Sequence, residues 1–200
     1  MIKLIKLLKE LNIQPKTPIG QGGEQIVYPS KIKSGFVIKK LYDEWESEDW
    51  AERIQISKQY PEVFAKVDKV DFDKGYIVQE KLDEKSLTKD LNELNDYLIK
   101  NDILFRNEQG EEEYYEEEEF GDLEDVLEIL VAFPNRINML LDNTPYEKTL
   151  KPKLKDFLER LNNAGFNKET GNIIRDVRID NVGYDTAGKI KILDFLLGSH

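Results

Sequence analysis

The sequence predicts an α+β fold in which a small antiparallel sheet is followed by a mainly helical region. Short β-branched and aromatic runs separated by glycine turns occupy residues 19–82, with one helical segment among them. From residue 83 onward, apolar residues recur every three or four positions, and a further pair of short strands follows near the C-terminus. We therefore expect two domains, residues 1–82 and residues 83–200.

The composition narrows the classes of function. Of the 200 residues, 40% are hydrophobic, which is enough for a real core. The formal charge of −11 argues against nucleic acid and anionic membranes as partners. The chain has no cysteine, so disulfides, thiol catalysis and cysteine-bound zinc are excluded. Its single histidine, His200, is the last residue, which argues against histidine-based catalysis and multi-histidine metal sites.

The N-terminal segment predicts an amphipathic helix over residues 2–13, with lysines spread through it. Such a helix packs on its own domain or lies on a membrane surface, and we favour the first alternative. Because no unbroken apolar run is present, it is neither a signal peptide nor a membrane span. We expect a cytoplasmic protein.

The first domain is predicted to contain two hairpins, with turns at Ser34–Gly35 and at Asp73–Gly75. Between them, residues 42–60 read as an amphipathic helix that ends at Pro61. The strand pairs are residues 26–32 with 36–41, and residues 63–72 with 75–82.

In the second domain, the apolar spacing predicts three helices. The first is capped by Ser86 or Thr88, Pro134 kinks or splits the second, and Gly165 ends the third. The acidic run of residues 111–119 reads as a solvated loop; binding of a basic partner, mimicry of nucleic acid and repulsion of competing phosphates are the alternatives. The helical segments are residues 86–101, 123–142 and 151–166.

A glycine-rich hairpin precedes a lysine in the first domain. Gly20, Gly22 and Gly23 allow a tight turn with exposed backbone N–H groups, and Lys39 lies on the next strand. Glycines beside an inward-pointing lysine form a device for holding phosphate. The segment spaced like G-x-G-x-x-G-x-V also supplies Val27, with Gln25 in place of the third glycine.

These residues resemble the nucleotide-binding motifs of the protein-kinase superfamily. The strand Phe36–Lys39 matches V-A-I-K and includes Val37. The resemblance implies a following helix with a glutamate that pairs with Lys39; Glu52 or Glu48 could serve, and we favour Glu52. It also implies a hinge at Glu80 to Leu82, after a gatekeeper at Gln79.

The C-terminal region is similar to the catalytic motifs of the same superfamily. The pattern H-R-D-x-x-x-x-N is matched at Arg175, Asp176 and Asn181, with Ile174 in place of histidine. The D-F-G pattern is matched by Asp194 and Phe195, with Leu196 in place of glycine; Gly183 fits the D-x-x-x-x-N-x-G variant that we associate with reduced bacterial or phage kinase-like proteins.

The resemblance implies an ATP-dependent phosphotransferase with a two-lobed, protein-kinase-like fold. Asp176 would accept the proton of the acceptor hydroxyl, Lys39 would contact the α- and β-phosphates, and Asn181 and Asp194 would bind Mg²⁺. The nucleotide would also contact the glycine loop, Val27, Val37 and the hinge. We expect Lys39 and Asp194 to face each other across a cleft. The acceptor is a small molecule or a protein.

The match also has departures that leave other functions open. The third glycine of the loop and the glycine of D-F-G are replaced, and we expect a truncated C-lobe without the peptide platform of protein kinases. The alternatives are a pseudokinase, which binds a protein partner with or without nucleotide, and an interaction module that acts through its acidic run. Binding of Mg-ATP and turnover distinguish the three.

Overall fold

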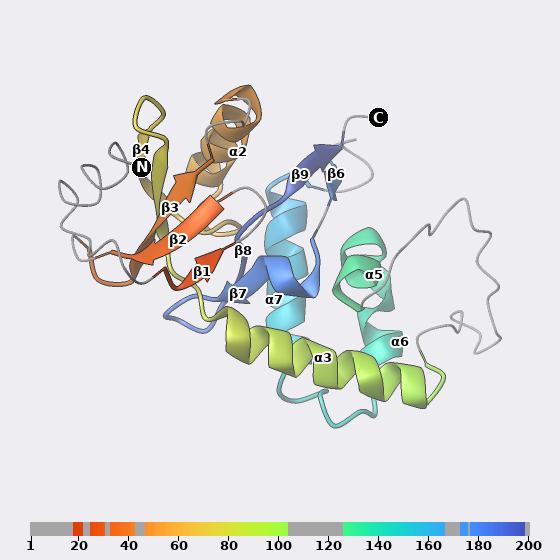
Figure 1. The fold of residues 1–200 in the computed structure, drawn as a ribbon. Coiled ribbons are helices and arrows are strands. Elements are labelled where there is room, and N and C mark those ends of the chain that lie inside the picture. The colour runs from red at the N-terminus through yellow and green to blue at the C-terminus, as the bar shows by residue number, and fades with distance from the viewer. Residues whose placement is uncertain are drawn as a thin grey trace. The chain divides into compact units, whose positions relative to one another are not determined.

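The computed structural model describes seven segments of the chain: residues 18–21, 25–30, 33–42, 47–103, 126–166, 173–175 and 177–198. The fold is mixed α and β, with an antiparallel sheet of five strands, in agreement with the predicted fold class. The chain divides into two compact units, Met1–Leu82 and Asp83–His200, and each is described by itself. The first runs from red to yellow in Figure 1, and the second from yellow-green to blue.

The first unit is built on an antiparallel sheet with the strand order β1-β2-β3-β5-β4. The two predicted hairpins form, because β2 pairs with β3 and β4 with β5, and β3 joins them by pairing with β5. One helix, α2 (Ser47–Gln59), accompanies the sheet. The strands are β1 (Gly20–Gln21), β2 (Gln25–Pro29), β3 (Phe36–Leu41), β4 (Val67–Asp71) and β5 (Tyr76–Glu80).

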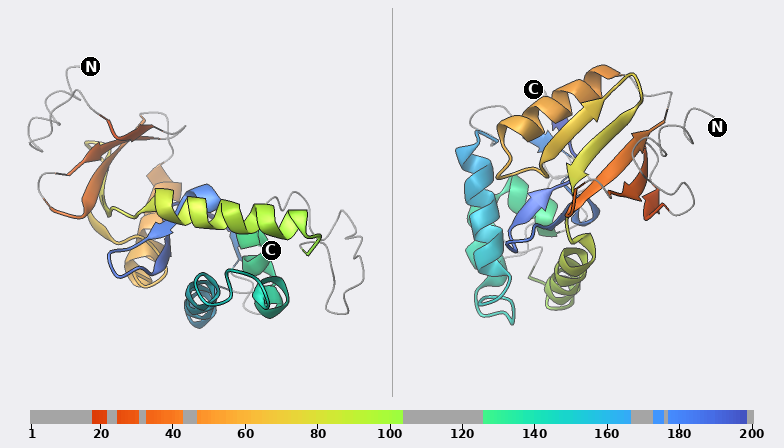
Figure 2. Two further views of the ribbon diagram at one scale, coloured as in Figure 1. Left: turned by 90° about the horizontal axis from the view of Figure 1, so that it is seen from below. Right: turned by 90° about the vertical axis from the view of Figure 1, so that its left-hand side faces the viewer.

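The two faces of this sheet bury different clusters of apolar residues. On one face, Tyr28, Ile38, Tyr76 and Val78 pack together. On the other, strand residues pack with α2, which lies along the sheet in Figure 2. Since successive strand residues point to opposite faces, every odd-numbered residue of β3 points to the face that α2 covers. This second cluster contains Leu41, Trp50, Ile54, Val67 and Ile77.

Glycines with positive φ make both predicted hairpin turns. Gly35 has φ 76° and Gly75 has φ 64°, a conformation that glycine adopts without the cost of a Cβ atom. The predicted strand over residues 63–72 is shorter than expected, because β4 begins only at Val67, while Val63 is buried in a turn and Phe64 in an isolated β-bridge ahead of it. Burial of these apolar side chains therefore does not require an extended strand.

The second unit begins with the long helix α3 (Glu84–Lys100), whose start differs from the prediction. Its N-cap is Asp83, whose Oδ1 accepts a hydrogen bond from the backbone N–H of Ser86 at 3.2 Å. The prediction of a cap at Ser86 or Thr88 is wrong, because an aspartate three residues earlier satisfies the first turn and leaves Ser86 inside it.

The remaining helices follow the predicted proline and glycine signals. Pro134 opens a short 3₁₀ turn, η1, that splits the predicted second helix in two. Gly165, with φ 81°, follows the end of the third predicted helix. The elements are α5 (Val126–Ala132), η1 (Pro134–Arg136), α6 (Ile137–Leu141) and α7 (Lys151–Asn163). Their buried side chains are mainly leucines, such as Leu130, Leu140 and Leu154.

Two short antiparallel strand pairs complete the second unit. Strand β7 (Val182–Tyr184) forms a hairpin with β8 (Ile190–Ile192), directly after the 3₁₀ turn η2 (Ile179–Asn181). Strand β6 (Ile173–Arg175) pairs with β9 (Leu196–Gly198). Helix α3 contacts β7 and η2, and α7 contacts β8, so the β7–β8 hairpin is held by two helices.

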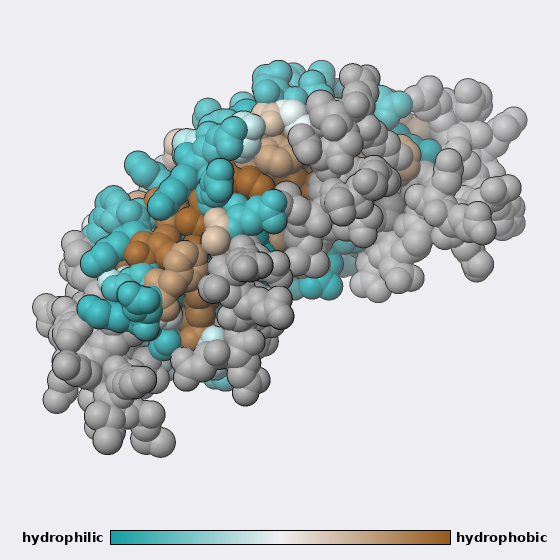
Figure 3. Space-filling view, turned by 90° about the horizontal axis from the view of Figure 1, so that it is seen from above, coloured by the Kyte–Doolittle hydropathy of each residue, from teal (hydrophilic) through white to brown (hydrophobic). Residues whose placement is uncertain are grey.

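The surface of the described part of the chain has few large exposed apolar side chains. Hydrophilic side chains lie around apolar ones on the face drawn in Figure 3. Ile19, just before β1, Phe72, just after β4, and Ile99 of α3 are exposed and lie far apart in the sequence. Within the described segments, no helix has the length and apolar character needed to cross a bilayer. The predicted N-terminal helix and the acidic run at 111–119 lie outside the described residues.

Candidate functional site

One group of predicted site residues lies together on the α2-covered face of the sheet. The register pairs Gly20 with Val27, and Val27 with Lys39, across β1, β2 and β3. Val37 lies on the same face, two residues from Lys39, and is paired with Gln79 of β5. A Cβ atom on Gly20 would lie 3.7 Å from the Val27 side chain. The sheet thus brings Gly20, Val27, Val37 and Lys39 to one face, as a phosphate-holding hairpin requires.

Lys39 is a buried lysine on the face of the sheet that α2 covers. It is only 5% exposed, and its strand neighbours across the sheet are Val27 and Ile77. Burial of an ammonium group is costly without anionic or polar partners. Lys39 is therefore a buried charged side chain at the position where the sequence predicts a phosphate ligand. Gly22 and Gly23 of the adjacent loop lie outside the described residues.

Helix α2 carries the glutamates expected to pair with Lys39. Its buried side contains Trp50, Arg53 and Ile54, with the Arg53 guanidinium 4.9 Å from the centre of the Trp50 ring. Glu52 is exposed, on the opposite side of the helix. The position of Glu52 deep in the helix is therefore no reason to prefer it over Glu48 as the partner of Lys39. The direction of the side chain matters more than its place along the helix. The side chain of Glu48 lies outside the description.

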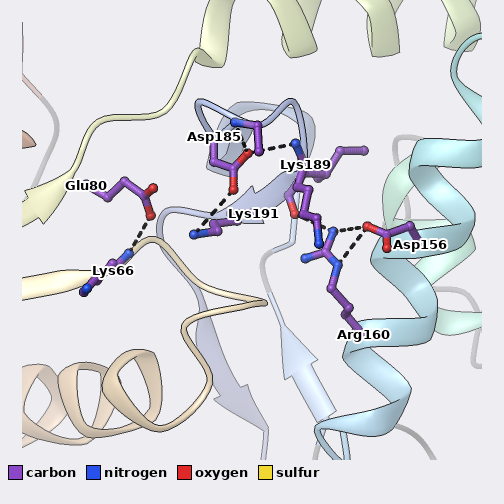
Figure 4. Close-up of polar contacts among 9 residues, drawn as sticks. Lys66, Glu80, Asp156, Arg160, Asp185, Lys189 and Lys191 are labelled. Atoms are coloured by element: carbon purple, nitrogen blue, oxygen red, sulfur yellow. Dashed lines mark hydrogen bonds and ion pairs between the residues drawn. The ribbon is translucent and has the colours of Figure 1, made fainter. Parts of the chain in front are cut away.

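The segment predicted as a hinge uses its backbone within the first unit. The N–H of Glu80 donates to the carbonyl of Lys66 at 2.8 Å, and the Glu80 carboxylate accepts from the N–H of Lys66 at 3.1 Å (Figure 4). The N–H of Lys81 donates to the carbonyl of Gly35 at 2.8 Å. Leu82 is buried. The base of a nucleotide bound along this segment would have to form its hydrogen bonds with groups other than the backbone N–H groups of Glu80 and Lys81.

The β7–β8 hairpin places Asn181 opposite the residue that precedes Asp194. The N–H of that residue, Leu193, donates to the carbonyl of Asn181 at 2.8 Å. Both side chains are half-buried. The N–H of Phe195 donates to Oδ1 of Asp194 at 3.0 Å, and Phe195 is buried, which fixes the backbone after the carboxylate. We call Asn181 and Asp194 the hairpin site.

The donor set of the hairpin site suits Mg²⁺ bound together with a nucleotide. It offers one amide oxygen and one carboxylate, and Mg²⁺ in nucleotide sites takes one or two protein oxygens with phosphate oxygens and water. Across the described segments, no group of three or more His, Cys, Asp or Glu side chains could hold a metal ion on its own. The residues therefore fit a metal that is shared with phosphate, and they do not form a separate protein cage.

The segment that carries the predicted catalytic base runs next to the hairpin site. Arg175 of β6 pairs with Leu196 of β9, and Leu196 is the second residue after Asp194. Asp176 follows Arg175 and lies outside the described residues. Ile174, which stands where the kinase motif has histidine, is buried and pairs with Leu197. The pairing of β6 with β9 thus places the segment before Asp176 beside the segment after Asp194.

Helix α3 holds β7 through residues that the sequence did not single out. The hydroxyl of Tyr184 donates to Oδ2 of Asp90 at 3.0 Å, and Asp83 and Tyr184 exchange backbone hydrogen bonds at 2.8 and 3.2 Å. The pKa of Tyr184 is raised far above its usual value, chiefly by burial and then by the hydrogen bond to Asp90 and the charge of that carboxylate. This tyrosine therefore stays a neutral donor. The hydroxyl of Thr88 donates to the carbonyl of Ile179 at 3.3 Å.

Helix α7 holds β8 through one arginine. Nη2 of Arg160 donates to the carbonyl of Ile190 at 3.0 Å, and the same guanidinium contacts Asp156 at 2.8 to 2.9 Å (Figure 4). The i, i+4 spacing of Asp156 and Arg160 could have suggested the ion pair. The contact to β8 has no signal in the sequence, because the two residues are thirty positions apart and the acceptor is a backbone carbonyl.

The comparisons with known proteins give little beyond this geometry. No protein-family model and no curated protein matches the chain. Among solved structures, the chain is similar to choline kinase LicA from Streptococcus pneumoniae, with 14% identity and a TM-score of 0.40. The match covers 96% of this chain and 66% of that one, so the chain spans about two thirds of its length. At this TM-score the likeness carries no weight for family or chemistry, and the kinase resemblance rests on the motifs.

Proposed function

We propose that the chain is an ATP-dependent phosphotransferase that transfers a γ-phosphoryl group to a hydroxyl of its substrate. The observation that carries the proposal is the hairpin site, where the Leu193–Asn181 backbone hydrogen bond holds Asn181 beside the strand end that presents Asp194. Transfer of a phosphoryl group depends on positioning and on neutralising charge more than on covalent chemistry. Two oxygen donors carried by one hairpin would supply such positioning.

Each site residue has a role in this proposal. Asn181 and Asp194 would hold Mg²⁺, which when bound neutralises negative charge on the phosphate oxygens. Lys39 would contact phosphate oxygens through its ammonium group. Asp176 would accept the proton of the attacking hydroxyl. Gly20, Gly22 and Gly23 would let the backbone approach the phosphates, while Val27, Val37 and the segment Glu80 to Leu82 would contact the rest of the nucleotide.

A pseudokinase is the second candidate, and one observation favours it. Leu196 stands where the kinase motif has glycine, and it is part of strand β9, paired with Arg175 of β6. An extended, paired backbone at this point differs from the flexible glycine of the motif. A chain of this kind would bind nucleotide or a protein partner without transfer.

A turnover assay separates the two candidates. The protein is incubated with Mg²⁺ and ATP labelled at the γ-phosphate, in the presence of small hydroxyl compounds or protein fractions, and labelled product and ADP are measured. The phosphotransferase proposal predicts label on an acceptor or release of ADP above that of the Asp194→Asn variant. Binding of Mg-ATP with turnover equal to that variant would support the pseudokinase instead.

Replacing Lys39 with Met should weaken nucleotide binding without unfolding the protein. Methionine keeps the apolar stem that packs between Val27 and Ile77, and it removes the charged contact to phosphate. We expect affinity for ATP to fall about tenfold or more, the value of a charge-assisted hydrogen bond. The measurement is calorimetric titration, with folding checked by circular dichroism.

The matched control is Lys40→Met on the same strand. Lys40 points to the other face of the sheet, and its Nζ donates to the carbonyl of Lys74 at 3.1 Å. This variant loses the same charge, so it corrects for the general effect of charge on binding a polyanion. Equal affinities in folded Lys39→Met and Lys40→Met would exclude Lys39 as a phosphate ligand.

A further inference from the structure

The β7–β8 hairpin contains a buried ion pair that the proposed function does not use. Nζ of Lys191 lies 3.7 Å from Oδ2 of Asp185, and the two side chains are only 10% and 11% exposed. Figure 4 shows the lysine of β8 pointing to the carboxylate at the start of the turn. Charges at this level of burial are costly unless they are paired, and this ion pair offsets part of that cost for both side chains.

Asp185 also organises the turn that joins the two strands. Its Oδ1 accepts hydrogen bonds from the N–H groups of Ala187 and Lys189, both at 2.9 Å, while Oδ2 faces Lys191. The carboxylate therefore connects the turn to the middle of β8. The exposed side chain of Lys189 lies in the same turn, and only its backbone takes part in these contacts.

The register relates this ion pair to Asn181 through the two strands. Asn181 lies opposite Leu193, which is two residues after Lys191, and all three residues of β7 and of β8 are buried. The register pairs Gly183 with Lys191. Lys191 therefore lies opposite a residue that has no side chain, and its ammonium group reaches Asp185.

The register of the hairpin decides whether the hairpin site exists. A slip by one residue in a strand pair moves every side chain to the opposite face. Such a slip would separate Asn181 from Leu193 and change where Asn181 lies relative to Asp194. Two strands of three residues are only marginally stable by themselves, so contacts outside the ladder must fix their register.

We propose that Lys191 and Asp185 are positioning residues that hold Asn181 and Asp194 in register for binding of metal and nucleotide. The inference rests on the proposed function for the role of the hairpin site, but the positioning itself can be measured without it. The ion pair acts through the hairpin backbone and touches neither substrate nor metal. It joins the turn to β8 independently of the hydrogen bonds that α3 and α7 make to this hairpin.

The test compares Lys191→Met with Lys189→Met, its matched control in the same turn. Asp185→Asn is the second variant; its side-chain oxygen can still accept from Ala187 and Lys189, so the turn is kept while the charge is lost. Two quantities are measured in each folded protein. One is hydrogen exchange of the Leu193 amide, which bonds to Asn181, with the Leu94 amide of α3 as internal reference. The other is the Mg²⁺ concentration for half-maximal ATP binding, together with ATP affinity without metal.

We expect Lys191→Met and Asp185→Asn each to speed exchange at Leu193 about tenfold relative to Leu94, as a local opening would. Each should raise the Mg²⁺ requirement about tenfold while metal-free ATP affinity stays unchanged, and the double variant should add little to either, because the two residues act as one pair. Lys191→Arg should restore much of the wild-type behaviour.

Two results would overturn the positioning role. One is unchanged Leu193 exchange in folded Lys191→Met and Asp185→Asn. The other is an equal effect of Lys189→Met. If the wild type binds no ATP in a Mg²⁺-dependent manner, the proposed function fails, while exchange at Leu193 still decides whether the pair holds the hairpin. If Lys191→Met does not fold, Asp185→Asn decides the question with the same two measurements.

Discussion

Replacing Asp176 with Asn is expected to reduce phosphoryl transfer about 1,000-fold, within the range found for a lost general base. The amide cannot accept the proton of the attacking hydroxyl, so the rate falls even when the acceptor is bound. Affinity for Mg-ATP should change by less than about twofold, because the residue acts on the acceptor and not on the nucleotide. The measurement compares turnover under saturating ATP with affinity from calorimetry.

Asp180→Asn is the control for this substitution. Asp180 follows Asp176 by four positions in the sequence, its side chain is exposed, and its Oδ1 lies 3.7 Å from Nε of Arg178. The control variant removes one carboxylate without removing the predicted base, so its turnover should equal that of the wild type. Equal turnover in Asp176→Asn and Asp180→Asn would sink the assignment of Asp176.

Replacing Asp194 with Asn should remove the Mg²⁺-dependent part of ATP binding. The amide oxygen can still accept from the N–H of Phe195, so the backbone after residue 194 should keep its conformation. The carboxylate charge that attracts the cation is lost. We expect ATP affinity in the presence of Mg²⁺ to fall about 100-fold, on the scale of losing one close charged ligand, with metal-free affinity unchanged or higher.

A control for net charge is needed, because the chain carries a formal charge of −11 and ATP is an anion. Asp96→Asn removes an exposed carboxylate of α3 in the same unit. It should leave the Mg²⁺ dependence of binding as in the wild type. If Asp194→Asn binds Mg-ATP with the affinity of Asp96→Asn, Asp194 is not a metal ligand.

Local signals predicted much of the fold correctly. Gly35 and Gly75 mark the turns of the two hairpins because their positive φ disfavours other residues. Pro134 marks the split between α5 and α6 because a helix interior cannot accommodate its ring and missing N–H. The start of α3 was misplaced because several polar residues in succession could serve as its cap, and only the structure shows that Asp83 does so.

Contacts between residues far apart in the sequence could not be predicted. The pairing of β6 with β9 joins two strands of three residues, which are too short for a periodic signal. The same holds for Arg160 with the carbonyl of Ile190. The outward direction of Glu52 on α2 depends on how the helix packs through Trp50 and Ile54. A motif match fixes the order of residues along the chain and leaves such directions open.

The hairpin site was predictable in part. The spacing between Asn181 and Asp194, filled by a strand, a turn and a strand, predicts that the two approach each other. What the spacing could not show is the support around them. Lys191 and Asp185 look like ordinary surface charges in the sequence, and only the structure shows that they are buried and paired.

The most direct measurement of the central claim uses Mn²⁺ in place of Mg²⁺ and follows the NMR signals of the protein with ATP present. Mn²⁺ broadens the signals of nuclei close to it. If Asn181 and Asp194 hold the metal with the nucleotide, the side-chain amide of Asn181 and the backbone amides of Asp194 and Phe195 should broaden first, and only when ATP is added. Broadening confined to the exposed carboxylates of α3, or equal with and without ATP, would contradict a metal-nucleotide site at the hairpin.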